Sequence, residues 1–167
     1  MNEDTGDNVW KNDSIEVYID GDNSKPGVYE ADCSQMTLGR YNIDSPIDEP
    51  ILNGYKGANG QGIAANTLGI KAAVVNTNYG WATEMAIPLD MFNVEVKDQG
   101  VIGFNIQMND DDDGGDRDHK LSWSEKELAA GELSYSNPSV FGELKFLIDY
   151  LSVNPNDSTV TTWGATK

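Results

Sequence analysis

The sequence is poor in the residues on which many catalytic and metal sites depend. It holds one cysteine, Cys33, and one histidine, His119, so it cannot form an internal disulfide or supply the usual zinc ligand sets. A Ser-His-Asp triad would have to use His119, and no Gly-x-Ser-x-Gly motif is present. The sequence therefore argues against nucleophilic and zinc-dependent catalysis, and favours a buried structural thiol at Cys33 and a solvated loop position for His119.

Basic residues and long apolar runs are also scarce. Eleven Lys and Arg stand against 28 Asp and Glu, which gives a formal net charge of −17 and a pI near 4.1. Nucleic acids and anionic membranes are bound through basic side chains, so the composition argues against both partners. No apolar run approaches the ~18 residues of a transmembrane helix, and no signal peptide is recognisable. The first residues are typical of a domain cut from a longer chain.

Glycine and aromatic residues, in contrast, are plentiful and indicate strands joined by turns. The sequence contains 17 Gly, 7 Tyr and 4 Trp. Residues 14–20 and 101–109 alternate between apolar and polar side chains, as half-buried strands do. Further strands are predicted at residues 35–40, 69–75, 79–87, 119–123 and 142–150.

Helices are expected to be few and short. Residues 88–92 are predicted to form one helical turn. Residues 124–131 are predicted to form a short helix, because Ser124 and Glu127 have the spacing of a capping box and Gly131 can end it. Residues 44–66 show no sustained periodicity and are predicted to be a long surface loop.

These elements predict an all-β fold, a β-sandwich or jelly roll of antiparallel strands. The length suits a single domain, which we place at residues 1–150. Residues 151–167 are polar and turn-rich, and we interpret them as a tail or linker.

Clustered acidic residues make calcium the metal to consider, because calcium takes oxygen ligands from acidic loops. One candidate group is Asp20, Asp22, Asn23 and Asp32. The other lies in the run of six aspartates between residues 110 and 118, from which we select Asp110 and Asp112. A plain Asx turn for the first group and a solvated acidic turn for the second remain open alternatives.

Aromatic residues in polar surroundings indicate a sugar-binding surface. A sugar presents an apolar face and a rim of hydroxyls, so its site needs a flat ring and polar side chains. Trp10 and Tyr135 both lie in polar stretches, whereas Trp81 lies in an apolar strand and is predicted to be in the core. Trp123 fits either role.

Glycoside hydrolysis needs two carboxylates that face each other across the sugar. Glu16 and Glu84 lie on predicted strands and are the best candidates for such a pair. We favour the interpretation that each makes hydrogen bonds within the sheet, because 28 acidic residues always supply some suitable pair.

Several blocks of the sequence resemble the family 9 carbohydrate-binding modules that are attached to secreted xylanases. They are residues 10–20 (Trp-Lys-Asn-Asp-Ser-Ile-Glu-Val-Tyr-Ile-Asp), 27–35, 82–88 (Ala-Thr-Glu-Met-Ala-Ile-Pro), 102–110, Arg117, 122–124 (Ser-Trp-Ser) and 137–144. The blocks occur in the order of the family and span residues 10 to 145. The strands that usually precede the first block are not apparent.

The resemblance implies a β-sandwich with structural calcium that grips a glucan or xylan chain, in some members its end, between two aromatic rings. Trp10 and Tyr135 fall on the positions of the rings, and Glu16, Gln107 and Arg117 fall on positions that hydrogen-bond the sugar. The chain departs from the family at Thr37 and Gly39, where Arg and Asn are usual, and in the Glu132–Leu133 region, where an Asn is replaced.

The sequence therefore predicts a secreted or cell-surface module that binds a polysaccharide or oligosaccharide without catalysis and belongs to a larger enzyme. The alternatives are a structural or protein-interaction domain with a decayed sugar site, favoured by the departures at Thr37 and Gly39, and a hydrolase built on the same sandwich.

Overall fold

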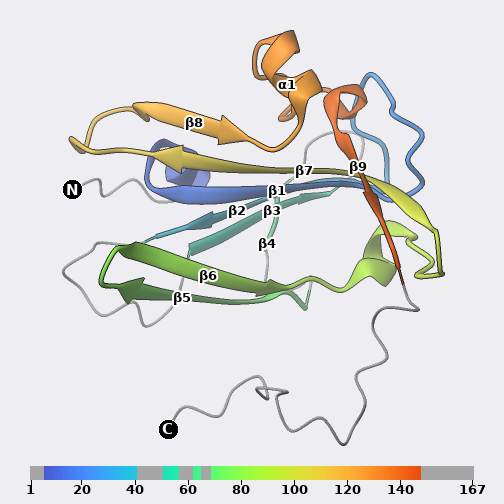
Figure 1. Ribbon diagram of the computed structural model, residues 1–167, viewed down its shortest axis with the longest axis horizontal. Coiled ribbons are helices and arrows are strands. Elements are labelled where there is room, and N and C mark those ends of the chain that lie inside the picture. Colours follow the sequence, from blue (N-terminus) through green and yellow to red (C-terminus); the bar gives the residue numbers. More distant parts are fainter. Residues whose placement is uncertain (1–5, 41–50, 57–61, 65–68, 148–167) are drawn as a thin grey trace, which may run out of the picture.

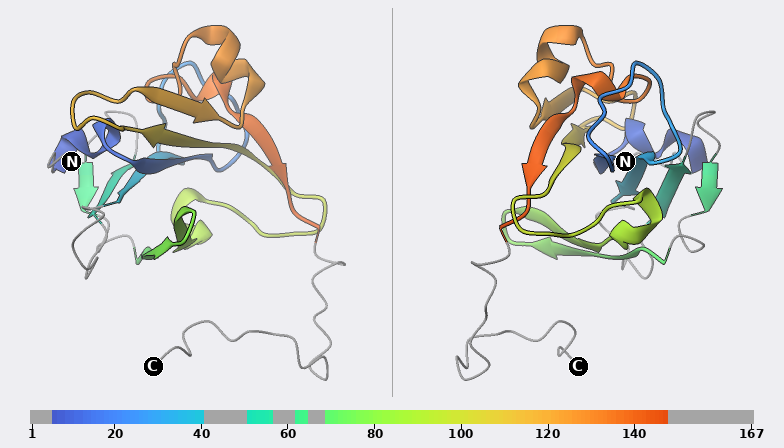
Figure 2. Two further views of the ribbon diagram at one scale, coloured as in Figure 1. Left: turned by 60° about the vertical axis from the view of Figure 1, so that its left-hand side comes forward. Right: turned by 90° about the vertical axis from the view of Figure 1, so that its right-hand side faces the viewer.

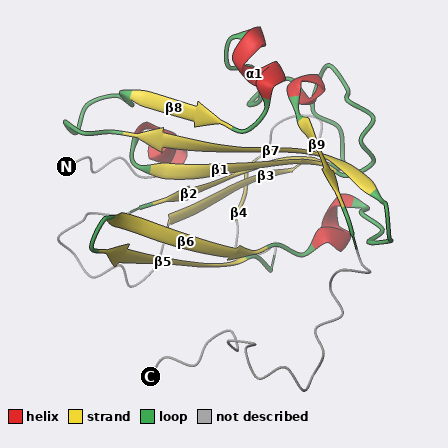
Figure 3. Ribbon diagram, viewed as in Figure 1, coloured by secondary structure: helices red, strands yellow, loops and turns green. Residues whose placement is uncertain are grey.

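A computed structural model describes residues 6–40, 51–56, 62–64 and 69–147. Antiparallel strands are the main secondary structure of this part of the chain (Figure 3). The larger sheet has the order β4-β3-β2-β1-β7-β8, and β9 also pairs with β7. Its strands are β1 (Ser14–Asp20), β2 (Cys33–Gly39), β3 (Ile51–Lys56), β4 (Gly62–Ala64), β7 (Val101–Asp110), β8 (His119–Ser122) and β9 (Gly142–Lys145). The second sheet is the hairpin of β5 (Lys71–Thr77) and β6 (Gly80–Ala86).

Within the described residues, one short helical segment precedes β1 and three more lie between strands. They are η1 (Gly6–Lys11), η3 (Leu89–Phe92), α1 (Glu125–Ala130) and η4 (Pro138–Val140). None of the helices in the described ranges is long and apolar enough to span a bilayer.

The main core lies between the two sheets (Figures 1 and 2). The alternation of β1 directs Val17 and Ile19 towards the β5–β6 hairpin, where they pack with Met36 of β2 and Ile102 of β7. Phe92 of η3 fills the same core and is fully buried. The antiparallel β-sandwich predicted from the sequence is thus confirmed.

A second buried layer covers the opposite face of the larger sheet. Tyr18 and Cys33 pack there with Tyr29, Val140 and Phe141, and the ring centroids of Tyr18 and Phe141 are 5.5 Å apart. Strand β1 is therefore buried on both faces, and the prediction that it would be half-buried is wrong. This second layer is built by α1, η4 and the loops beside them, which lie across the sheet from the β5–β6 hairpin (Figure 1).

Two other sequence predictions need correction. Residues 44–66 are not a continuous loop, because β3 pairs along β2 and β4 pairs with β3. The final strand ends at Lys145 and does not extend through the described residues that follow it. The predicted tail, residues 151–167, lies outside the described residues.

Candidate functional site

Strands β1 and β7 build one polar surface by their register. Glu16 lies opposite Gln107, Tyr18 opposite Asn105, and Ser14 opposite Asn109. Because alternate residues of a strand share a face, all these side chains project away from the sandwich core. We call this surface, together with the side chains bonded to it, the polar face; those side chains are Arg117, Lys120, Glu127 and Glu132. It holds three of the five predicted sugar-binding residues, Glu16, Gln107 and Arg117.

Glu16 is buried at the centre of the polar face and fully hydrogen-bonded. Its Oε2 accepts from the Tyr18 hydroxyl and from Gln35 Nε2, both at 2.6 Å. Its Oε1 accepts from Asn109 Nδ2 at 2.8 Å, with Arg117 Nη1 at 4.0 Å. Such donors satisfy the oxygens of a carboxylate that is removed from water. Burial and the adjacent Glu16 also raise the pKa of Tyr18 well above its ordinary value, so its hydroxyl stays a donor.

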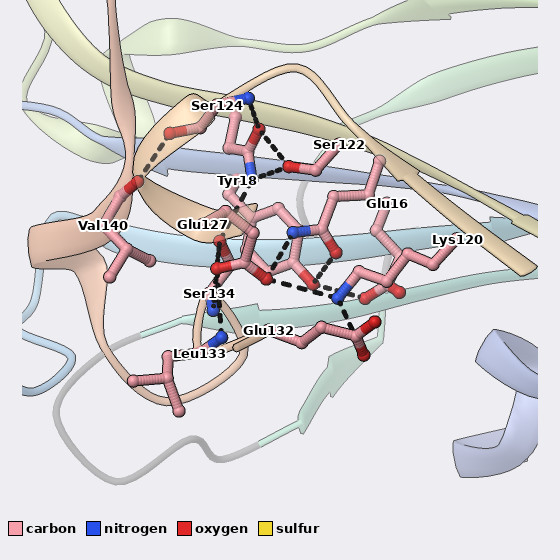
Figure 4. Close-up of polar contacts among 12 residues, drawn as sticks. Glu16, Tyr18, Lys120, Ser122, Ser124, Glu127, Glu132, Leu133, Ser134 and Val140 are labelled. Carbon is pink, nitrogen blue, oxygen red and sulfur yellow. Dashed lines mark hydrogen bonds and ion pairs between the residues drawn. The ribbon is translucent and has the colours of Figure 1, made fainter. Parts of the chain in front are cut away.

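Gln107 connects the strands to helix α1. Its Oε1 accepts from the Tyr18 hydroxyl at 3.2 Å, and its Nε2 donates to Glu127 Oε1 at 2.9 Å. Lys120 Nζ also donates to Glu127 Oε1, at 3.2 Å (Figure 4). The amide of Gln107 is thereby held between a phenol and a carboxylate.

Arg117 joins this network to the first aromatic ring. Its Nη1 donates to Asn109 Oδ1 and its Nη2 donates to Glu132 Oε2, each at 2.9 Å. Its guanidinium lies 5.3 Å from the centroid of the Trp10 ring, at the distance of a cation–π contact. Trp10 belongs to η1 and is 38% exposed, so part of the ring remains open to a ligand.

Tyr135 lies on the loop that follows α1 and is 63% exposed. Its neighbour Ser134 is buried and donates from both its backbone N–H and its hydroxyl to Glu127 Oε2, each at 2.8 Å. The structure therefore brings Trp10, Glu16, Gln107 and Arg117 into one hydrogen-bonded and stacked network, and it ties Tyr135 to that network through Ser134.

The departures from the resembled family are visible on the neighbouring strand. Thr37 lies opposite Glu16 on β2 and is buried. Arg40 does not replace the missing arginine, because it extends towards the β5–β6 hairpin, donates to Asp13 and Asn76, and lies 6.0 Å from the Trp81 ring.

Sequence reasoning missed two residues of the polar face, Lys120 and Glu127. The pair Ser124 and Glu127 correctly indicated a helix, but no side-chain cap forms. Ser124 instead donates its hydroxyl to the Val140 carbonyl, and Glu127 points into the sheet. In the sequence, Glu127 is recognisable only as an acidic residue on a short helix, and nothing in the local pattern indicates that it is buried.

The loop between β1 and β2 gathers the first group of predicted metal ligands. Asp20 is fully buried, its Oδ2 accepts from Lys25 N at 2.9 Å, and its Oδ1 has no hydrogen-bond partner within the described residues. Asn23 Oδ1 is also buried and has no hydrogen-bond partner within the described residues. Ligand atoms of Asp20, Asp32 and Cys33 lie within 4.8 Å of one another. Asp22 is exposed and its Oδ1 accepts from Ser24 N, as in an Asx turn.

Burial, together with the neighbouring carboxylates of Asp22 and Asp32, raises the pKa of Asp20 to about 6, although the hydrogen bond from Lys25 N acts in the opposite direction. A buried carboxylate with an unpartnered oxygen, next to an unpartnered amide oxygen, has the oxygen donors that a hard cation takes. The residues of this loop therefore fit calcium.

The second acidic loop groups a different set from the one selected by sequence. Asp111, Asp113 and Asp118 bring one carboxylate oxygen each within 4.8 Å of the others. Asp110 ends β7 with its Oδ2 3.9 Å from His119 Nδ1, and Asp112 donates its backbone N–H to Asp118. Asp110 and Asp112 are not members of this group.

The carboxylates considered for hydrolysis point away from each other. Glu16 precedes the core residue Val17 on β1, and Glu84 precedes Met85, which packs against the same core from β6. Each glutamate therefore projects from the outer face of its own sheet, on opposite sides of the sandwich. They cannot act on one glycosidic bond.

Comparisons with known proteins show the family and the fold. Residues 1–148 match the family model described as carbohydrate family 9 binding domain-like. The chain is 31% identical over 140 residues to endo-1,4-beta-xylanase A of Thermotoga neapolitana, which covers 84% of this chain and 11% of that protein. It also superposes on a family 9 module from Caldicellulosiruptor kristjanssonii in complex with cellotriose, with a TM-score of 0.64, 18% identity, and coverage of 86% of this chain and 63% of that one. A structure of a family 9 module from the same organism in complex with glucose gives a TM-score of 0.63 at 18% identity, covering 84% of this chain and 62% of that one.

The chain thus spans about a tenth of the length of the curated xylanase and under two thirds of the solved modules. The structural likeness, at this level of identity, establishes the sandwich fold.

Proposed function

The chain belongs to the carbohydrate family 9 binding domain-like family and is a non-catalytic domain, and from that premise we propose that its polar face binds β-linked glucan or xylan chains, in particular their ends. The Trp10 and Tyr135 rings would stack on the apolar faces of the sugar. Arg117 would hydrogen-bond its hydroxyls. The other two predicted contacts, Glu16 and Gln107, are 3% and 1% exposed and would hold the network that orients Arg117.

The observation that carries this proposal is a half-open indole beside a fixed polar network. Arg117 is held by Asn109 and Glu132, and its guanidinium lies 5.3 Å from the centroid of the Trp10 ring. Lys11 Nζ lies 5.7 Å from the same centroid, and Trp10 is still 38% exposed. Binding is strongest where such polar groups are oriented before the ligand arrives, because little entropy is then lost.

The charge of the polar face favours neutral sugars. The carboxylates of Glu16, Glu127 and Glu132 stand against the two cations Arg117 and Lys120, and both cations are already paired with Glu132. A uronic acid would meet a surface with one excess negative charge on a chain of net charge −17. The solved complexes of the structural neighbours, with cellotriose and with glucose, contain neutral sugars of this kind.

Calcium would support the fold beside this surface. Asp20, Asn23 and Asp32 would hold the ion, with Asp22 at the rim of the loop, and the ion would neutralise carboxylates that are otherwise crowded together. The aspartate-rich loop that contains Asp110 and Asp112 is the second place where we propose calcium.

The similarity to part of a xylanase supports a place for this domain in a larger extracellular enzyme. There it would hold the catalytic domain near its polysaccharide and would need neither a nucleic acid nor a membrane as partner.

Isothermal titration calorimetry with cellotriose and xylotriose tests the proposal. The variants Trp10→Ala and Tyr135→Ala should each weaken binding about tenfold or more, since buried aromatic contacts dominate binding energies. Tyr79→Ala is the matched control, because Tyr79 is fully exposed on the turn between β5 and β6. Equal affinities for all four proteins would show that the polar face is not the sugar site.

One further observation favours the alternative, an interaction domain. Leu121 of β8 is 63% exposed and Trp123 is 51% exposed, both on the side of the larger sheet that faces the core. Exposed apolar surface of this kind marks protein contacts. If no sugar binds, a difference between the sedimentation coefficients of Leu121→Ser and the wild type would show that this surface makes protein contacts.

A further inference from the structure

We propose that Glu127 is a positioning residue of the sugar site, which fixes the loop that carries Tyr135 against the polar face and so sets the place of the second aromatic ring. This inference rests on the proposed function. Glu127 itself would not touch the sugar, since its side chain is fully buried.

The two carboxylate oxygens of Glu127 have separate partners. Oε1 faces the sheet, where it accepts from Gln107 Nε2 at 2.9 Å and from Lys120 Nζ at 3.2 Å. Oε2 faces the loop, where it accepts from the backbone N–H groups of Leu133 and Ser134 at 3.0 and 2.8 Å, and from the Ser134 hydroxyl at 2.8 Å. One side chain therefore clamps the loop to β7 and β8 (Figure 4).

The chemistry of the clamp depends on a negative charge. A carboxylate is an acceptor on both oxygens, whereas a glutamine side chain has one acceptor oxygen and a donating NH₂ group. Glutamine at position 127 would leave one side of the clamp with donors facing donors. It would also leave Lys120, whose side chain is only 8% exposed, without its closest counter-charge.

The backbone of the loop explains why a clamp is needed. Gly131 and Glu132 both have positive φ, at 83° and 66°, so the chain reverses sharply as it leaves α1. Ser134 is then held at three points. Its backbone N–H donates to Glu127, its carbonyl accepts from the Tyr29 hydroxyl at 2.6 Å, and its hydroxyl accepts from Asn105 at 3.0 Å. Tyr135 follows directly, so its Cα is placed by Ser134 while its ring stays exposed.

The clamp and the Glu16 network share one residue, Gln107. Gln107 contributes to both, because its Oε1 accepts from Tyr18 in the Glu16 network and its Nε2 donates to Glu127. A shift of the loop would therefore separate the Tyr135 ring from the hydrogen-bonding groups, without unfolding the sheet.

A double-mutant cycle tests the proposal. Cellotriose affinity is measured by calorimetry for the wild type, Glu127→Gln, Tyr135→Ala and the combined variant, with Glu125→Gln as the control on an exposed position of the same helix. We expect Glu127→Gln to weaken binding about tenfold in the wild-type background and less than about twofold when Tyr135 is already alanine. Glu125→Gln should bind like the wild type.

The outcomes separate this inference from the proposed function. Absence of binding by the wild type would overturn both. Wild-type binding that Glu127→Gln leaves unchanged, or weakens equally in both backgrounds, would overturn the positioning role alone. If Glu127→Gln does not fold by circular dichroism, Ser134→Ala removes a single hydroxyl of the clamp, and the same cycle with Tyr135→Ala must show the same dependence.

Discussion

Replacing Asp20 with asparagine should stabilise the metal-free protein at neutral pH and remove the calcium stabilisation that comes from the loop between β1 and β2. Burial raises the pKa of Asp20 from its ordinary value of 3.8 to about 6. The folded state therefore holds the proton more tightly than the unfolded state does. The stability contributed by this proton is fully present below pH 3.8 and is lost as the pH rises through 6.

The size of the effect follows from the two pKa values. Each pKa unit corresponds to about 1.4 kcal/mol, so the ionised Asp20 costs the metal-free folded state about 3 kcal/mol at pH 7. Asparagine carries no charge, and its amide oxygen can still accept from Lys25 N. In EDTA, the free energy of unfolding of Asp20→Asn should thus exceed that of the wild type by about 3 kcal/mol at pH 7, and by little at pH 4.

Calcium should close most of the stability gap between the two proteins. Calcium that binds the folded state at 100 times its Kd adds about 2.7 kcal/mol of stability. At pH 7 the wild type should gain stability of this size from calcium at the loop that contains Asp20. Asp20→Asn should gain little there, because it has lost a ligand charge.

Urea unfolding of both proteins at pH 4 and pH 7, each in EDTA and in calcium, measures the free energy of unfolding under the four conditions. Asp98→Asn removes an exposed carboxylate and serves as the control. A metal-free Asp20→Asn protein that is less stable than the wild type at pH 7, or an equal gain from calcium in both proteins, would refute the reasoning.

Two further results are expected. Burial raises the pKa of the Cys33 thiol to about 12, so Ellman's reagent at pH 8 should label Cys33 only in urea, and prompt labelling of the native protein would contradict its burial. Gly21→Ala should destabilise the fold by about 1–3 kcal/mol in thermal melts, because its Cβ would lie 1.8 Å from the Phe92 carbonyl oxygen. Gly27→Ala, whose Cβ would meet nothing within 4 Å, should change stability little, and similar losses in the two variants would argue against the packing described here.

Alternation in the sequence was sufficient to find β1 and β7 and to assign their faces. It could not show that the polar faces are the more buried ones. Asn105, Gln107 and Asn109 are almost fully buried, whereas Ile106 between them is more than a third exposed. That inversion depends on α1 and the loops that fold over the sheet, which no local pattern records.

Strand β3 was missed for a related reason. Residues 51–56 contain Asn53 and Gly54, which favour a turn when read locally. In the fold Gly54 lies opposite Met36 in a ladder with β2, so pairing with a neighbouring strand overrides the local preference.

The candidate site was predicted in its parts and not in its connections. The family resemblance gave Trp10, Glu16, Gln107, Arg117 and Tyr135 as separate positions. The structure adds the buried pair of Lys120 and Glu127 that joins the loop to the sheet. Long-range contacts of this kind follow from tertiary packing, so a single sequence does not contain them in readable form.

Calorimetric titration of the wild-type protein in calcium with cellobiose, and with cellobiitol, in which the reducing-end ring is opened, tests the central claim most directly. A module that stacks the reducing-end ring between Trp10 and Tyr135 should release heat with cellobiose and none with cellobiitol. Absence of heat with cellobiose, and with xylobiose in the same experiment, would contradict the assignment of the polar face as a site for neutral sugar chains.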